Sequence, residues 1–147
     1  VHYLESGGSM QVTEDYQICV EEARAFLNVA KYCSRDALEF LTGNMYPAVV
    51  NAAFSCELFL KAIMIHNSDD NRFMKVHDLD KLFEALPSND KSAIDEIYIR
   101  KTGKNTDDFL SRSSNLFLKW RYAFEEGVSV NFSELLSFAE ALEEYLE

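Results

Sequence analysis

Charged residues occur at helical spacing inside two strongly apolar segments of this chain. Glu57 and Lys61 are four positions apart, so on a helix they share one face and pair in the favoured Glu-to-Lys order. Arg121 and Glu125 have the same spacing in the reverse order. If the two helices pack together, these four residues form one partly buried polar cluster, which costs desolvation energy. Such a cluster either fixes helix register or serves function, and the residues alone favour the structural role.

The remaining titratable side chains lack the spacing of known metal or nucleophile sites. The histidines fall in three different elements: His2, His66 and His77. The cysteines are odd in number, form no CxxC pair and lie in apolar helical patterns: Cys19, Cys33 and Cys56. We therefore expect no metal site, no cofactor and a core of reduced, buried thiols, which is typical of a cytoplasmic protein.

Composition limits both the fold and the binding partners. The 147 residues are 48% hydrophobic and 27% charged, which is the balance of one globular domain. With 25 acidic against 14 basic residues the net charge is -11, so the average surface repels phosphate, and a bulk electrostatic DNA binder is excluded. Five glycines and two prolines leave little material for turn-rich sheets, and an all-α fold follows.

Hydrophobic periodicity predicts about four long helices and two short ones. The long helices are expected over 14–41 with Gly43 as C-cap, over 47–66, over 106–127, and from a cap at Asn131 or Ser133 to about 146. The short ones, 77–86 and a helix that Ser88 caps and that contains Tyr98, are expected as satellites of the core. Residues 1–10 are interpreted as a flexible leader or cloning remnant, and 11–147 as a single domain.

The apolar stretch 46–65 is almost long enough to span a bilayer. Glu57 and Lys61 lie near its centre, and each such charge costs about 2.5 to 3.5 kcal/mol on insertion scales. We therefore expect no membrane association, and interpret the stretch as the central buried helix of a bundle.

Three motifs occur in a fixed order along the chain. They are AFSCELFLKA at 53–62, HDLDKLF at 77–83 ahead of a proline, and KWRYAFE at 119–125. Their order and spacing resemble the HEPN superfamily, especially bacterial stand-alone members with an E-L-x-L-K helix, an H-D-L segment and a W-R-Y-x-[FY]-E helix. The resemblance covers about residues 14–147 and implies an up-and-down helical bundle that often dimerises. It also implies roles in toxin–antitoxin pairs, phage defence, and RNA or nucleotide handling.

Many proteins of this superfamily are metal-independent ribonucleases with a late R-x(4-6)-H motif, in which the arginine steadies phosphate charge and the histidine moves a proton. Here the late helix offers Arg121, but no histidine follows it. Arg72 and His77 have the required spacing, yet they precede the short third helix, where His77 is expected to cap or orient that helix. Whether the protein is an enzyme stays open. Arg72 and His77 are the weak catalytic candidates, in a variant site with Arg121.

The resemblance implies that the protein binds RNA or nucleotide phosphate. The binding residues it implies are Lys61, Arg121 and Tyr122, with His77 beside them. The alternatives are a non-catalytic dimerising interaction module, or a ribonuclease with a variant Arg/His site. Binding is favoured over catalysis because the late histidine is missing and the net charge opposes phosphate-rich substrates. We expect a homodimer with the second or fifth helix at its interface, and a nucleotidyltransferase as a protein partner in a toxin–antitoxin setting.

Overall fold

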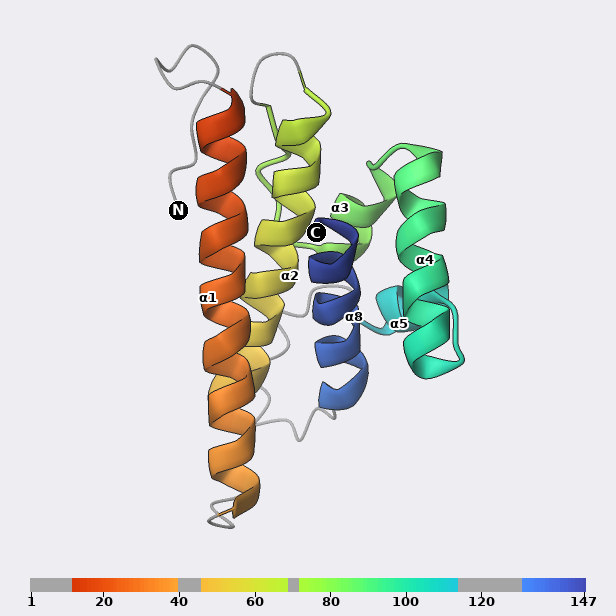
Figure 1. Cartoon of the computed structure of the whole chain (residues 1–147). Helices are drawn as coiled ribbons and strands as arrows, with labels where there is room; N and C mark the ends of the chain where they lie inside the picture. Colours follow the sequence, from red (N-terminus) through yellow and green to blue (C-terminus); the bar gives the residue numbers. More distant parts are fainter. Residues whose placement is uncertain (1–11, 40–45, 69–71, 114–130) are drawn as a thin grey trace.

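The computed structural model describes residues 12–39, 46–68, 72–113 and 131–147 (Figure 1). These ranges form helices and contain no strand, so the predicted all-α class is confirmed. The helices are α1 (Val12–Glu39), α2 (Tyr46–His66), α3 (Leu79–Glu84), α4 (Ser88–Thr102), α5 (Thr106–Arg112) and α8 (Phe132–Tyr145). The expected leader and the expected C-cap Gly43 lie outside the described residues.

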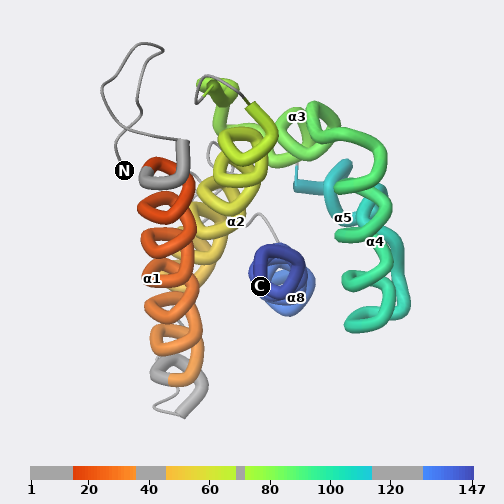
Figure 2. Tube along the Cα trace, turned by 45° about the horizontal axis from the view of Figure 1, so that its top comes forward, coloured from red at the N-terminus to blue at the C-terminus, as the bar shows by residue number. Residues whose placement is uncertain are grey.

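Helix α2 is the centre of the molecule. It lies between α1 and α8, and α4 packs on the far side of α8 (Figures 1 and 2). Chain direction alternates between α1 and α2 and between α8 and α4, whereas α2 and α8 run the same way. Of its 21 residues 14 are buried, which leaves little of α2 for a partner and argues against the second helix as a dimer interface.

By length and hydropathy α2 is the one described helix that could cross a membrane. The most apolar part of α2 is 78% buried inside the bundle, as in the core helix of a globular domain.

The satellite role expected for α4 is wrong. Helix α4 is 15 residues long and buries Ile94 and Tyr98 completely. The Tyr98 ring lies 5.9 Å from that of Phe109 on α5 and 6.0 Å from that of Phe138 on α8, centroid to centroid. Aromatic rings at these distances join three helices in one part of the core.

The helix expected over 106–127 ends at Arg112 instead. The Ser113 hydroxyl donates a 2.8 Å hydrogen bond to the carbonyl of Phe109, and the Ser113 amide bonds the same carbonyl and that of Leu110. Serine side chains compete for backbone partners in this way, which favours helix ends over helix interiors.

Helix N-termini are capped mainly by Asx side chains. Asn131 accepts a 3.2 Å hydrogen bond from the Glu134 amide, which confirms one of the two caps expected for α8. Ser88 is not the cap of α4, because Pro87 occupies that position and makes no side-chain bond. At α3 the cap is Asp78, which accepts from the Asp80 amide at 3.0 Å.

Candidate functional site

The predicted pairing of Glu57 with Lys61 is confirmed. The Lys61 ammonium lies 3.5 Å from Glu57 Oε2, and the side chains are 2% and 0% exposed. Helix α2, which carries both side chains, lies between α1 and α8. The sequence predicts Lys61 as a binding residue, but an ammonium this deeply buried presents little surface to a ligand.

His77 joins this buried pair from the segment between α2 and α3. Its Nδ1 lies 2.5 Å from Glu57 Oε1, while its side chain is 65% exposed. The expectation that His77 caps α3 is wrong, because the neighbouring Asp78 does so. One buried carboxylate therefore contacts both an ammonium and an imidazole that reaches the surface.

Phe73 covers the cationic end of the cluster. The Lys61 ammonium lies 5.5 Å from the centroid of the Phe73 ring, within the range of a cation–π interaction. Burial lowers the pKa of Lys61, and the carboxylate of Glu57 acts in the opposite direction. The segment 72–77 thus reaches the α2 charges twice, through Phe73 and through His77.

The thiols near this cluster are part of the core. Cys19 Sγ donates to the Leu58 carbonyl at 3.1 Å, and burial raises its pKa to about 12. Burial also raises the pKa of Cys56, well above its ordinary value. The prediction of buried, unpaired thiols is confirmed for these two cysteines, whereas Cys33 is only half-buried.

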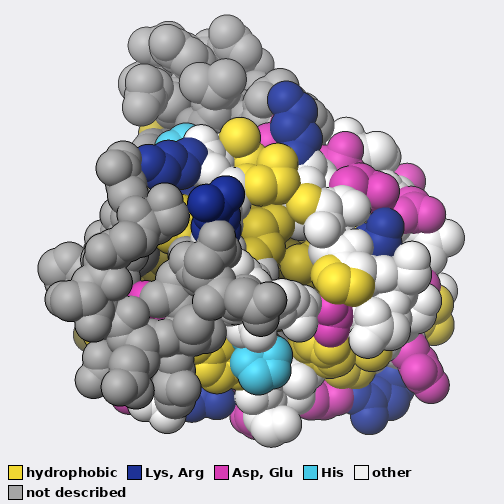
Figure 3. Space-filling view, turned by 90° about the horizontal axis from the view of Figure 1, so that it is seen from above, with side chains coloured by type: hydrophobic (Ala, Val, Ile, Leu, Met, Phe, Trp, Pro, Cys, Tyr) yellow, Lys and Arg dark blue, Asp and Glu magenta, His cyan; other side chains and the backbone are white. Residues whose placement is uncertain are grey.

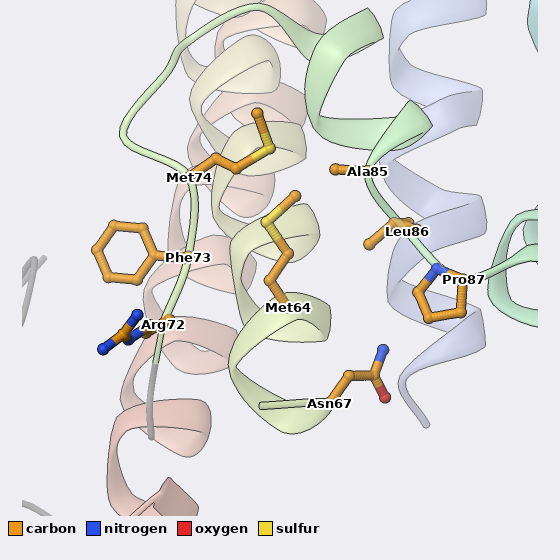
Figure 4. A pocket seen from close by; sticks show the side chains of 8 residues that line it. All are labelled: Met64, Asn67, Arg72, Phe73, Met74, Ala85, Leu86 and Pro87. Carbon is orange, nitrogen blue, oxygen red and sulfur yellow. The ribbon is translucent and has the colours of Figure 1, made fainter. Parts of the chain in front are cut away.

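An open pocket of about 390 Å³ lies beside the cluster, where α2 ends and α4 begins. Met64 and Met74 lie side by side in it, with Leu86 and Pro87 opposite (Figure 4). Arg72 and Phe73 point to the other side of their chain segment, away from Leu86 and Pro87. On this end of the molecule hydrophobic side chains gather next to Lys and Arg side chains (Figure 3).

The late-helix candidates Arg121, Tyr122 and Glu125 lie outside the described residues. The predicted four-residue cluster is therefore placed only for its α2 half. Among described residues no three His, Cys, Asp or Glu side chains are arranged to hold a metal ion.

The geometry provides a carboxylate–imidazole pair next to exposed basic side chains. Because a carboxylate can only accept a hydrogen bond, Nδ1 of His77 carries the proton in its contact with Glu57. Arg72 and Lys75 are exposed in the same segment. Sequence reasoning missed the contact between Glu57 and His77, although both residues belong to motifs that it singled out.

No curated protein and no solved structure matches the chain. Residues 16–147 match the model of the HEPN domain, which covers every described helix from within α1 to α8. This match agrees with the all-helical fold. The chain therefore belongs to the HEPN domain family.

Proposed function

We propose that the protein binds the phosphate of RNA or of a nucleotide through the segment 72–77. HEPN domains as a family have RNA-related and nucleotide-related roles. In this acidic protein the segment carries three groups that suit an anion, Arg72, Lys75 and His77, all of them exposed. The observation that carries the proposal is the contact of His77 with buried Glu57, because it fixes the imidazole while leaving it accessible.

The contact prepares His77 for an anionic ligand. A buried carboxylate holds Nδ1 in one orientation, so the ring loses little freedom when the imidazolium form, in which both ring nitrogens donate, gives its Nε2 hydrogen bond to a phosphate oxygen. Arg72 adds a planar guanidinium five residues earlier in the chain. Phe73, the residue after it, holds the segment against α2 through the contact of its ring with Lys61. Local basic groups of this kind are what an acidic chain requires for phosphate binding.

Fluorescence anisotropy with a labelled single-stranded RNA 12-mer, and calorimetry with ATP, test the proposal and separate RNA from nucleotide as ligand. We expect Arg72→Ala and His77→Gln each to weaken binding about tenfold, or about 1.4 kcal/mol. The matched control is Arg100→Ala, an exposed arginine on α4 that pairs with Glu144 away from the segment, and its affinity should equal wild type. Absence of binding to either probe, or equal losses in the control, refutes the proposal and leaves a non-catalytic interaction module.

A second candidate function is RNA cleavage, and the carboxylate–imidazole contact also favours it. Nε2 of His77 would take the proton from a ribose 2′-hydroxyl, whose oxygen attacks the adjacent phosphorus. The bond to the 5′-oxygen then breaks, which leaves a 2′,3′-cyclic phosphate and a 5′-hydroxyl once a proton reaches the leaving oxygen. Arg72 would balance the charge that develops on the phosphate oxygens.

Denaturing gels of the same RNA, with end-group analysis of products, decide between binding and cleavage. Cyclic phosphate ends that disappear in His77→Gln support the enzyme. Bound but intact RNA rejects it and retains the binding function.

The biological setting that goes with this proposal is a cytoplasmic toxin–antitoxin or phage-defence pair with a nucleotidyltransferase partner. The support is the family membership of the chain. Co-purification with the product of an adjacent nucleotidyltransferase gene tests it, and loss of the complex in high salt alone would count against a specific pair.

A further inference from the structure

The pocket where α2 ends has two apolar walls. Met64 of α2 and Met74 of the segment 72–77 form one wall (Figure 4). Leu86 and Pro87, which connect α3 to α4, form the other. Met74 is 37% exposed, so the pocket presents apolar surface to solvent. Its volume of about 390 Å³ is in the range of small-molecule sites.

The chemistry of these walls suits a flat, uncharged ring. Thioether sulfurs make favourable contacts with aromatic rings, and the unbranched side chains of Met64 and Met74 can adjust to the shape of a ring. Among the described residues that line the pocket only Arg72 is charged, and its side chain points to the other side of the segment. The part of a ligand that enters the pocket is therefore expected to be neutral.

Asn67 supplies an oriented polar group to the same pocket. Its Nδ2 donates a 2.9 Å hydrogen bond to Asp90 Oδ2, and because a carboxylate can only accept, this contact sets which end of the amide is nitrogen. Asp90 is 6% exposed and also accepts a hydrogen bond from the Tyr145 hydroxyl. In the described part of the chain the second Nδ2 hydrogen and Oδ1 of Asn67 have no other partner. The amide thus offers a donor next to an acceptor.

We propose that this pocket holds an unpaired adenine base of a single-stranded RNA whose phosphates bind the segment 72–77. The inference rests on the proposed phosphate binding and adds base recognition to it. Arg72 and Met74 point to opposite sides of the segment, and their Cα atoms are at most about 7 Å apart (Figure 4). A strand that crosses the segment can therefore place a phosphate beside Arg72 and a base against Met74.

Adenine suits the pocket better than the other RNA bases do. It is the one RNA base without a carbonyl oxygen, so its transfer into an apolar pocket leaves the fewest polar groups without a partner. Its N6 amino group and N7 form a donor next to an acceptor, which an asparagine amide such as that of Asn67 pairs with in two hydrogen bonds. The basic neighbours would also suit an acidic peptide, but the oriented amide beside two thioethers favours the base.

Methyl NMR with adenosine tests the pocket without any phosphate. The protein is labelled with ¹³C at the methionine methyl groups, and the signals of Met64 and Met74 are assigned with the Met64→Leu and Met74→Leu variants. We expect the ring current of bound adenosine to move both signals upfield. Asn67→Ala should weaken adenosine binding about tenfold, and Asp90 keeps the Tyr145 hydroxyl as a donor in this variant.

Fluorescence anisotropy with two labelled 12-mers separates base recognition from phosphate binding. One is oligo(A), and the other is a strand of abasic ribose phosphates of the same length. Wild type should bind oligo(A) about tenfold more tightly than the abasic strand. Ala85→Trp fills the pocket from an exposed position and should reduce this ratio to about one. Asn89→Trp, at an exposed position of α4, is the matched control and should keep the tenfold ratio.

The outcomes distinguish the pocket from the phosphate site. Arg72→Ala should weaken binding of both strands and leave their ratio unchanged. Equal affinities of wild type for both strands overturn the base pocket while the phosphate site stands. Binding of neither strand refutes the phosphate site and with it the role of the pocket in RNA binding. Methyl signals that move with a short acidic leucine peptide but not with adenosine overturn the inference as well, and assign the pocket to a protein partner.

Discussion

Replacing Glu57 by glutamine is expected to destabilise the protein by about 3 to 5 kcal/mol. The substitution keeps the shape of the side chain but removes the carboxylate that lies 3.5 Å from the Lys61 ammonium, and Lys61 is 2% exposed. A buried charge that loses its counter-charge retains the full cost of desolvation. For a domain of this size each kcal/mol lowers the melting temperature by about 2 to 4 °C, so Tm should fall by roughly 6 to 20 °C.

Two further variants separate a lost ion pair from general damage to the core. The double variant Glu57→Gln/Lys61→Met removes both charges at similar volume and should recover most of the loss, since an apolar replacement of a buried pair is often neutral. Glu84→Gln removes the acid of a partly exposed pair, Glu84 with Lys91 at 3.7 Å, and should cost less than about 0.5 kcal/mol.

The pH dependence of the Glu57→Gln variant provides an independent check. Burial lowers the folded-state pKa of Lys61 below its usual 10.5, so between the lowered value and 10.5 the unfolded chain binds more protons, and stability rises with pH. In the Glu57→Gln variant the pKa of Lys61 falls further, so the stability lost relative to wild type should be smaller at pH 9.5 than at pH 7. Urea unfolding followed by circular dichroism at both pH values measures this. The role of the buried ion pair would be refuted if Glu57→Gln lost less than about 1 kcal/mol of unfolding free energy, or lost the same amount at both pH values.

Three other outcomes are expected. In the native protein Cys33 should react with a thiol reagent at pH 8 before Cys19, because burial raises the pKa of Cys19 to about 12. Mass spectrometry over time measures the order of labelling, and equal rates for the two cysteines would contradict this. Asn131→Ala should cost about 1 kcal/mol in a urea melt by removing the α8 cap, and an unchanged midpoint would show that the cap contributes nothing. Burial acts to raise the pKa of Glu134, but hydrogen bonds from Arg112 and Lys104 lower it below the usual 4.5. The ionised Glu134 therefore stabilises the fold above pH 4.5, and this contribution is lost as the pH falls through the folded-state pKa. Arg112→Gln should therefore reduce the loss of stability between pH 5 and 3 in thermal melts, and an acid limb identical to wild type would argue against the pair.

Local patterns predicted the central helix and its ion pair. Helix α2 was expected over 47–66 and is observed over Tyr46–His66, because a long apolar run between breakers leaves few alternatives. Glu57 and Lys61 meet because a spacing of four is built into any helix. In both cases the structure depends on residues close together in the chain.

Contacts between distant residues were not predictable in this way. His77 reaches Glu57 across 20 residues, and the path of the intervening segment is set by packing rather than by periodicity. The core role of Tyr98 was missed for the same reason, since its partners Phe109 and Phe138 come from two other helices. The end of α5 depends on hydrogen bonds of Ser113, a residue type that sequence patterns tolerate inside helices.

The burial of α2 also has a consequence for synthesis on the ribosome. Helix α1 precedes α2 and covers one side of it as soon as both have emerged, because adjacent helices close in microseconds. The other side waits for α8, which ends about 80 residues later and is therefore complete only after roughly 4 to 16 s of translation. During that interval a nascent helix with the hydropathy of a membrane span is half uncovered. The buried Glu57 and Lys61 then lie on the emerging chain as charges that oppose its insertion into a bilayer.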